Sequence, residues 1–151
     1  MRKFITENVD QTIKLAQKLA GFLKKGNVLG LIGELGSGKT TFVKGIAKGL
    51  RIKEDNVLSP SFVLIREYQG KLPLYHFDLY RLNYVEEVEF LGYEDYFYGE
   101  GVSCVEWAEK IENLLPTEYL KIKFDILGSN KRNIIFYPRG SHFKEMIKRI
   151  K

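Results

Sequence analysis

The chain has 151 residues, of which 44% are hydrophobic and 28% charged, which is the balance of a soluble globular protein. This length predicts a single domain over residues 1–151. One cysteine, Cys104, and two histidines exclude a disulfide framework and disfavour a cysteine- or histidine-based metal centre. No apolar run approaches the roughly 18 residues of a membrane span, and polar residues from Thr6 onward interrupt any signal-peptide core. We therefore expect a cytoplasmic protein without membrane contact.

The net charge of +5 is unevenly distributed. From Lys121 to the C-terminus there are nine Lys and Arg residues against two carboxylates, whereas 83–109 holds eight carboxylates and no Lys or Arg. This asymmetry predicts an acidic face and a basic face that could meet different partners. Two solvated surfaces would explain the same pattern.

The first third of the chain predicts a helix, a strand and a second helix. Asn8 and Gln11 are typical of a capping box, and apolar residues at helical spacing lead to a glycine stop at Gly26. Residues 28–32 form the short apolar run of a strand buried on both faces. A helix ending near Lys48 follows the next loop.

The remainder alternates strands and short helices, which together predict a three-layer α/β domain with a mixed sheet. In the acidic stretch we expect Phe90, Leu91 and Phe97 to be buried, Cys104 to lie in the core, and His76 to be packed or hydrogen-bonded. The expected elements are a hairpin of 62–68 and 74–77, one or two helices over 86–98 broken at Gly92, a buried strand at 102–105, a helix at 108–115, a hairpin of 119–127 and 133–137, and a final helix capped by Ser141.

A phosphate-binding loop follows the first predicted strand. Gly33-x4-Gly38-Lys39-Thr40 matches the P-loop pattern between an apolar strand and a helix. Successive backbone N–H groups and the helix dipole would bind phosphate oxygens, while the lysine neutralises them and the Thr40 hydroxyl binds Mg²⁺. The expected contacts to ATP are Gly36, Ser37, Gly38, Lys39, Thr40 and Thr41.

A P-loop needs carboxylates to hold Mg²⁺ and position water. Asp78 and Glu106 each end an apolar strand, where an α/β fold places its ligands. A lone carboxylate at such a position is more often a helix cap or an ion-pair partner, but two of them beside a P-loop favour function. Ser59-Pro60-Ser61 lies where nucleotide-sensing switches occur, although a plain turn is the alternative.

Five motifs in order resemble the TsaE (YjeE) family, and the resemblance covers nearly the whole chain. They are Gly-Glu-Leu-Gly-Ser-Gly-Lys-Thr-Thr (33–41), Ser-Pro-Ser-Phe (59–62), His-Phe-Asp-Leu-Tyr-Arg-Leu (76–82), Leu-Gly-Tyr-Glu-Asp-Tyr-Phe (91–97) and Val-Glu-Trp (105–107). The resemblance implies a three-layer P-loop fold with a mixed, mostly parallel sheet and a C-terminal antiparallel hairpin.

The resemblance also implies roles for individual residues. Thr40 and Glu106 would hold Mg²⁺, and Asp78 would be the carboxylate required for hydrolysis. Ser59 and Ser61 would belong to switch I, with serine at 61 where the family usually has threonine. Arg132 would contact the nucleotide, and residues 6–12 would approach the adenine.

By the same resemblance, the chain would be the ATP-binding component of tRNA threonylcarbamoyladenosine modification. Its expected partners are TsaD and TsaB, which transfer the threonylcarbamoyl group, and its expected cofactors are ATP and Mg²⁺. ATP binding and hydrolysis would sustain turnover of the TsaD–TsaB complex. A weak intrinsic ATPase, activated with partners, is expected because no arginine finger is evident; Arg81 is the nearest candidate.

Two other functions fit parts of the sequence. A small P-loop metabolite kinase would need an arginine-rich lid, but the seven arginines are scattered and the region after Asp78 is acidic. A nucleic-acid module would use a basic stripe in the C-terminal third to contact tRNA. Surface lysines that favour thermal stability explain the same residues. We expect the acidic face to meet protein and any tRNA contact to use the basic face. The stripe would comprise Lys121, Lys123, Lys131, Arg132 and Arg139.

Overall fold

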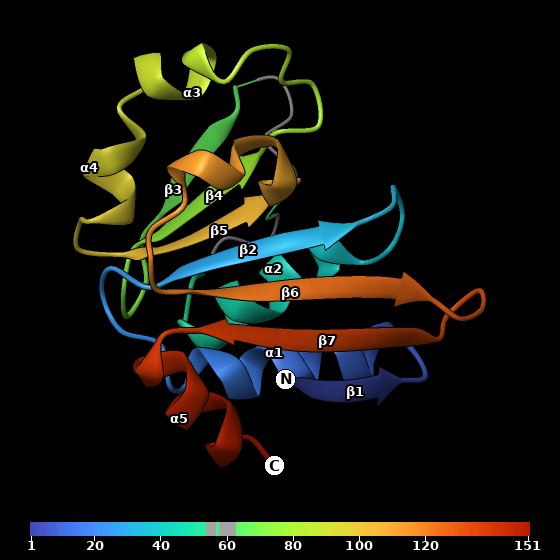
Figure 1. The fold of residues 1–151 in the computed structure, drawn as a ribbon. Coiled ribbons are helices and arrows are strands. Elements are labelled where there is room, and N and C mark those ends of the chain that lie inside the picture. Colours follow the sequence, from blue (N-terminus) through green and yellow to red (C-terminus); the bar gives the residue numbers. More distant parts are fainter. Residues whose placement is uncertain (54–56, 58–62) are drawn as a thin grey trace.

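A seven-stranded sheet in the order β1-β7-β6-β2-β5-β4-β3 organises the protein (Figure 1). The computed structural model describes residues 1–53, 57 and 63–151. No helix in these ranges is long and apolar enough to span a bilayer. The elements are β1 (Arg2–Thr6), α1 (Val9–Ala20), β2 (Val28–Gly33), α2 (Lys39–Gly49), β3 (Ile65–Tyr68), β4 (Leu74–Asp78), α3 (Glu86–Phe90), α4 (Tyr93–Phe97), β5 (Val102–Glu106), the 3-10 helix η1 (Ala108–Leu114), β6 (Tyr119–Ile126), β7 (Arg132–Arg139) and α5 (Ser141–Arg149).

The centre of the sheet is parallel and its edges are antiparallel. Strand β2 pairs in parallel with β5 and β6, and β4 pairs in parallel with β5. The antiparallel pairs are β3–β4, β6–β7 and β1–β7. In the β4–β5 register Asp78 lies opposite Glu106. The two predicted carboxylates therefore meet at the same edge of the sheet.

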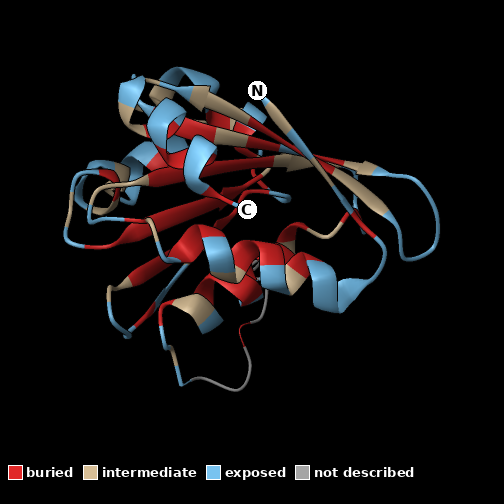
Figure 2. Cartoon of the chain, turned by 90° about the horizontal axis from the view of Figure 1, so that it is seen from below, coloured by how far each residue is buried: buried red, intermediate tan, exposed pale blue. Residues whose placement is uncertain are grey.

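Two hydrophobic clusters place helices on both faces of the sheet. Helices α1, α2 and α5 contribute to one cluster, and α3, α4 and η1 to the other. Figure 2 shows buried residues along the central strands and on the inner sides of the helices that cover them. Helices α1 and α2 approach each other closely at Gly45, which has no side chain. A Cβ atom added there would lie only 2.5 Å from the Cβ of Ala16. The predicted three-layer, mixed-sheet architecture is confirmed.

Several predicted elements need correction. Residues 2–6, for which no element was predicted, form edge strand β1 by pairing with β7, and α1 ends at Ala20 instead of near Gly26. The helix predicted at 108–115 is a 3-10 helix. Within the acidic stretch Phe97 is buried as predicted, but Phe90 and Leu91 are exposed because Val88 is the buried residue of α3. The two helices separated at Gly92 and both predicted hairpins are confirmed.

The two predicted helix caps differ in outcome. Asn8 has extended backbone geometry, and its Oδ1 accepts a hydrogen bond from the Gln11 amide at 2.9 Å. Ser141, in contrast, is the first residue of α5, whose N-cap is Gly140 without a side-chain hydrogen bond. The predicted cap at Ser141 is therefore wrong.

This difference predicts unequal costs for two similar substitutions. Asn8→Ala should lower the free energy of unfolding by about 1 kcal/mol, because it removes the acceptor for a helix-terminal N–H. Ser141→Ala should change it by less than about 0.5 kcal/mol. Urea unfolding of both variants checks this, and equal losses would contradict the assignment.

Candidate functional site

The loop between β2 and α2 has the backbone geometry of an anion-binding loop. Gly36 and Gly38 adopt left-handed conformations with φ of 78° and 104°, which residues with side chains rarely adopt. Among the described residues, no heavy atom would lie within 4 Å of a Cβ atom at either position. Gly38 is also the N-cap of α2, and the amides of a first helical turn, which have no partner inside the helix, are the groups that bind anions.

A cleft of about 460 Å³ opens at this loop. It lies where β2, β4 and β5 end, the edge at which α/β sheets place ligands. Its lining comes from five parts of the chain, namely Val9 and Thr12, residues 35–41, Asp78 with Tyr80 and Arg81, Glu106 with Trp107, and Ser129, Asn130 and Arg132. The tertiary structure thus brings together most of the residues predicted from separate motifs.

Lys39 is held by the loop itself. Its Nζ donates hydrogen bonds to the carbonyl oxygens of Gly33 at 2.5 Å and Glu34 at 2.9 Å. The same nitrogen lies 4.2 Å from the centroid of the Trp107 ring. Burial lowers the pKa of Lys39, and nearby carboxylates, chiefly Glu106, oppose that shift. The buried ammonium group of Lys39 therefore lies beside the loop, and an anionic ligand could replace its carbonyl partners.

Glu106 is fixed by two side chains. The Thr40 hydroxyl lies 2.9 Å from both carboxylate oxygens of Glu106, and His76 Nε2 lies 2.5 Å from Oε2. Both His76 and Glu106 are buried. The prediction that His76 is packed or hydrogen-bonded is confirmed, but its contact with Glu106 was missed. A carboxylate oxygen only accepts, so His76 donates from Nε2 in this contact. Among the described residues Nδ1 has no hydrogen-bond partner.

Asp78 lies beside this pair at the end of β4. The backbone amide of Tyr80 donates to Asp78 Oδ1 at 3.0 Å. Burial raises the pKa of Asp78 and the negative charge of Glu106 adds to the rise, whereas the Tyr80 amide, His76 and Lys39 oppose it. Perturbed carboxylates inside a cleft are typical of functional sites. The two carboxylates therefore have different hydrogen-bond partners. Glu106 contacts Thr40 and His76, whereas Asp78 accepts from the Tyr80 amide.

Trp107 is a cleft residue whose role the sequence left undecided. It has a left-handed backbone with φ of 62°, uncommon for a large side chain, and its amide donates to the Leu31 carbonyl at 3.0 Å. The turn places its indole over Lys39 and 5.2 Å from the ring of Tyr80. In the sequence, the one indication that Trp107 lies at the cleft was its position directly after Glu106, a carboxylate that ends a strand.

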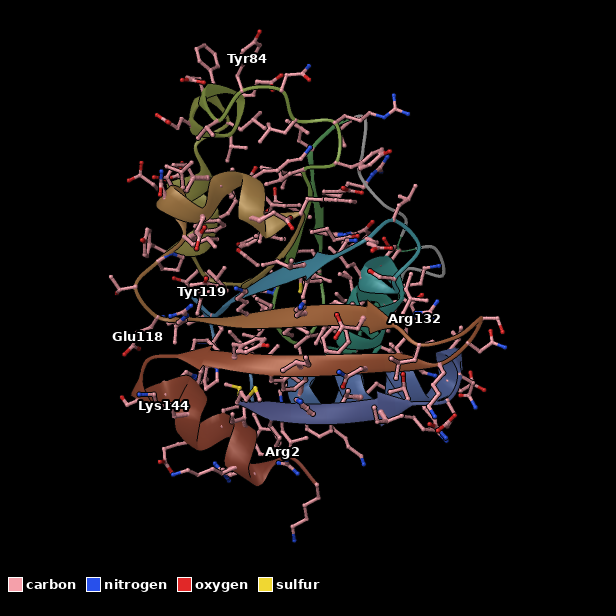
Figure 3. The ribbon with its side chains drawn as sticks, turned by 45° about the vertical axis from the view of Figure 1, so that its right-hand side comes forward. Arg2, Tyr84, Glu118, Tyr119, Arg132 and Lys144 are labelled. Atoms are coloured by element: carbon pink, nitrogen blue, oxygen red, sulfur yellow. The ribbon has the colours of Figure 1, made fainter. Side chains whose placement is uncertain are left out.

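Arg132 reaches the P-loop from the β6–β7 hairpin. Its Nε donates to the Ser37 carbonyl at 3.0 Å, and its terminal nitrogens donate to Gly36 at 3.2 Å and Gly128 at 2.8 Å. Figure 3 shows Arg132 at the end of the hairpin close to α2. Arg132 therefore ties the hairpin turn to the phosphate loop at the wall of the cleft.

Arg132 consequently does not belong to the predicted basic stripe. Lys121 and Lys123 are more exposed than their buried β6 neighbours Leu120 and Ile122, and Lys121 Nζ lies 5.6 Å from the centroid of the Tyr137 ring. Lys121 and Lys123, the stripe residues on β6, are therefore accessible, as expected if the hairpin faces outward. Arg132 instead contacts the phosphate loop.

Other predicted site residues lie at the cleft or beyond the described ranges. From the segment 6–12, Val9 and Thr12 line the cleft, and the Thr12 hydroxyl lies 2.8 Å from that of Thr6. Arg81 also lines it. The predicted switch residues Ser59 and Ser61 lie outside the described residues.

The side chains present fit a nucleoside triphosphate with Mg²⁺. Oxygen ligands are what Mg²⁺ prefers, and it is usually held by one or two protein groups together with phosphate oxygens. The Thr40 hydroxyl and Glu106 carboxylate supply such oxygens 2.9 Å apart. The open space beside Gly36 and Gly38 leaves room for phosphates at the backbone amides.

Comparisons with known proteins agree on one family. Residues 6–134 match the family described as "Threonylcarbamoyl adenosine biosynthesis protein TsaE". A protein named tRNA threonylcarbamoyladenosine biosynthesis protein TsaE from Bacillus subtilis is 47% identical over 143 residues, covering 94% of this chain and 89% of that protein. Its namesake from Aquifex aeolicus is 40% identical over 141 residues, covering 92% and 98%. The crystal structure of Bacillus subtilis YdiB is similar with a TM-score of 0.84 at 39% identity, covering 99% of this chain and 93% of that one.

Proposed function

We propose that this chain, which belongs to the TsaE family of tRNA threonylcarbamoyladenosine biosynthesis, binds ATP with Mg²⁺ and hydrolyses it slowly. In this proposal ATP binding and hydrolysis act on the TsaD–TsaB complex and sustain its turnover. The observation that carries the proposal is the convergence of Lys39, Thr40, Asp78 and Glu106 in one cleft at the P-loop. These residues come from three separate elements, α2, β4 and β5.

Each of these side chains has a role that its surroundings support. Lys39 would exchange its carbonyl partners, Gly33 and Glu34, for the β- and γ-phosphates. Thr40 and Glu106 would hold Mg²⁺, which supplies charge neutralisation at the phosphates. His76 would orient the Glu106 carboxylate through their hydrogen bond, as residues bonded to metal ligands do.

Asp78 would orient the attacking water. Its position opposite Glu106 puts a second carboxylate at the same cleft without sharing the Thr40 hydrogen bond. The raised pKa of Asp78, caused mainly by burial, gives it more affinity for a proton than an exposed aspartate has. That property suits a group that accepts or steers a proton from water.

The contacts of Arg132 agree with slow hydrolysis in isolation. Stabilising the transferring phosphoryl group by an arginine is a large term in P-loop catalysis. Arg132 lies at the cleft but donates to the carbonyl oxygens of Ser37 and Gly36, so its charge is engaged with the loop. The proposal therefore assigns the activation of hydrolysis to the assembled complex.

Nucleotide-dependent association tests this function. The purified chain should bind an immobilised TsaD–TsaB complex with ATP and Mg²⁺ present, and at least about ten times more weakly without nucleotide, a coupling of roughly 1.4 kcal/mol. The nucleotide would act by favouring the binding-competent state of the cleft. Equal binding with and without ATP, or none at all, would contradict the proposal. Phosphoryl transfer to a small metabolite instead of water would favour a kinase.

A further inference from the structure

An apolar groove lies apart from the nucleotide cleft, beside α3. It has a volume of about 820 Å³, and its apolar lining includes Val63, Leu64, Tyr84, Phe90 and Leu91. Phe90 is 96% exposed and Tyr84 70% exposed. Figure 3 shows Tyr84 at the end of the molecule opposite α5. The groove is thus an exposed aromatic surface, in the region where the sequence predicted burial.

This exposure is unusual for residues of this kind. A phenylalanine removed from water contributes roughly 1.5–3 kcal/mol, yet the five-residue helix α3 buries only Val88. Phe90 therefore adds nothing to the packing of the described core. Exposed apolar patches with a polar rim mark interaction sites, and rigid aromatic side chains are the usual anchors of interfaces.

The groove is held in shape by backbone contacts. Leu64 has a left-handed backbone with φ of 66°, and its carbonyl accepts the Asp78 amide at 3.0 Å. Across the groove, Glu87 Oε2 accepts the amides of Asn83 and Tyr84, each at 3.0 Å, at the start of α3. A preformed surface loses less entropy on binding. The contact with Asp78 also joins the groove to the nucleotide cleft.

The charge around the groove selects the kind of partner. Glu86 and Glu87 line it and Glu89 lies on the same short helix, within a stretch from 83 to 109 that has no Lys or Arg. Phosphate groups of RNA would be repelled by these carboxylates, whereas Lys and Arg side chains would be attracted. The matching surface of the partner is apolar and surrounded by basic residues.

We infer that this groove is a docking site for a partner protein, which covers Phe90 and Tyr84 with an apolar surface rimmed by Lys and Arg. The inference rests on the proposed function, because the partner used to test it is the TsaD–TsaB complex. It goes further in assigning the contact to a specific surface and chemistry.

Truncation of the aromatic anchors tests the surface. With ATP and Mg²⁺ present, Phe90→Ala and Tyr84→Ala should each weaken binding to TsaD–TsaB by about 10- to 30-fold, the range of interface anchors. Tyr98→Ala is the matched control, because Tyr98 is 67% exposed in the same acidic stretch but does not line the groove. It should bind within about twofold of wild type. All three variants should keep the wild-type affinity for ATP, since none of these residues lines the cleft.

Charge reversal tests the rim separately. Glu86→Lys with Glu89→Lys should slow association with TsaD–TsaB, and more strongly at low salt, where steering is least screened. Glu145→Lys on α5, at the opposite end of the molecule (Figure 1), is the control and should have little effect. Glu87 is left unchanged because it holds the start of α3.

The outcomes separate the two proposals. If wild type binds TsaD–TsaB and Phe90→Ala binds as tightly as Tyr98→Ala, the docking site is overturned and the proposed function stands. If wild type does not bind TsaD–TsaB at all, the proposed partner fails and the docking inference fails with it. Concentration-dependent dimers of wild type in sedimentation, lost in Phe90→Ala, would assign the groove to a second copy of this chain and overturn the inference.

Discussion

Lys39→Ala should abolish useful ATP affinity while leaving the fold intact. Hydrogen bonds to charged groups contribute roughly 1.5–3 kcal/mol each, and the ammonium group is the side-chain cation that the P-loop offers to the β- and γ-phosphates. Losing two such bonds predicts a dissociation constant at least about 100-fold weaker. Calorimetric titration of ATP with Mg²⁺ measures this directly.

The fold should survive this substitution because the carbonyl oxygens that Lys39 contacts belong to a half-buried residue, Gly33, and an exposed one, Glu34. The acceptors at Gly33 and Glu34 can bond to water once the ammonium group is removed. Lys44→Ala is the matched control, since Lys44 is an exposed lysine of the same helix, and its ATP affinity should equal that of wild type. An unchanged dissociation constant in Lys39→Ala would remove the nucleotide site from the P-loop.

Substitutions of the two carboxylates should separate hydrolysis from Mg²⁺ binding. Asp78→Ala should retain ATP and lose about 10²- to 10⁴-fold in hydrolysis in the assembled complex, the range for loss of an acid–base group. Glu106→Ala should instead remove the gain in ATP affinity that Mg²⁺ provides. Single-turnover hydrolysis and ATP titrations with and without Mg²⁺ measure the two effects.

Controls with conserved shape distinguish lost chemistry from lost structure. Glu106→Gln keeps an acceptor for His76 Nε2, which Glu106→Ala would leave buried without a partner. Burial raises the pKa of Asp78, so the folded state disfavours its charged form and loses stability as pH rises through that pKa. Asp78→Asn should therefore melt no lower than wild type at pH 7 although it is inactive. Wild-type hydrolysis by both Asp78→Ala and Glu106→Ala would refute the assignment.

The local parts of the site could be predicted from the sequence. Gly36, Gly38 and Lys39 act through consecutive backbone groups between a strand and a helix, so their arrangement depends on contiguous residues. Asp78 and Glu106 could be placed together because the carboxyl ends of parallel strands meet at one sheet edge. The apolar runs 74–77 and 102–105 identified the strands that end in these two carboxylates.

Elements that depend on distant pairing could not be predicted in the same way. Strand β1 has five residues and exists because β7 supplies its partners, so its own pattern was insufficient. The short helix α3 buries one side chain, Val88. Local hydrophobicity could not determine which of its apolar residues faces inward, and Phe90 was assigned to the core although it is exposed.

The phosphate-loop chemistry, the two strand-ending carboxylates and the acidic and basic segments could all be assigned from the order of the residues. Three contacts could not: His76 with Glu106, Trp107 with Lys39, and Arg132 with the phosphate loop. Each of these contacts depends on a feature that neighbouring residues do not specify. The first contact depends on the register between β4 and β5, and the second on the left-handed backbone of Trp107. The third joins residues 95 positions apart, a distance that local spacing does not encode.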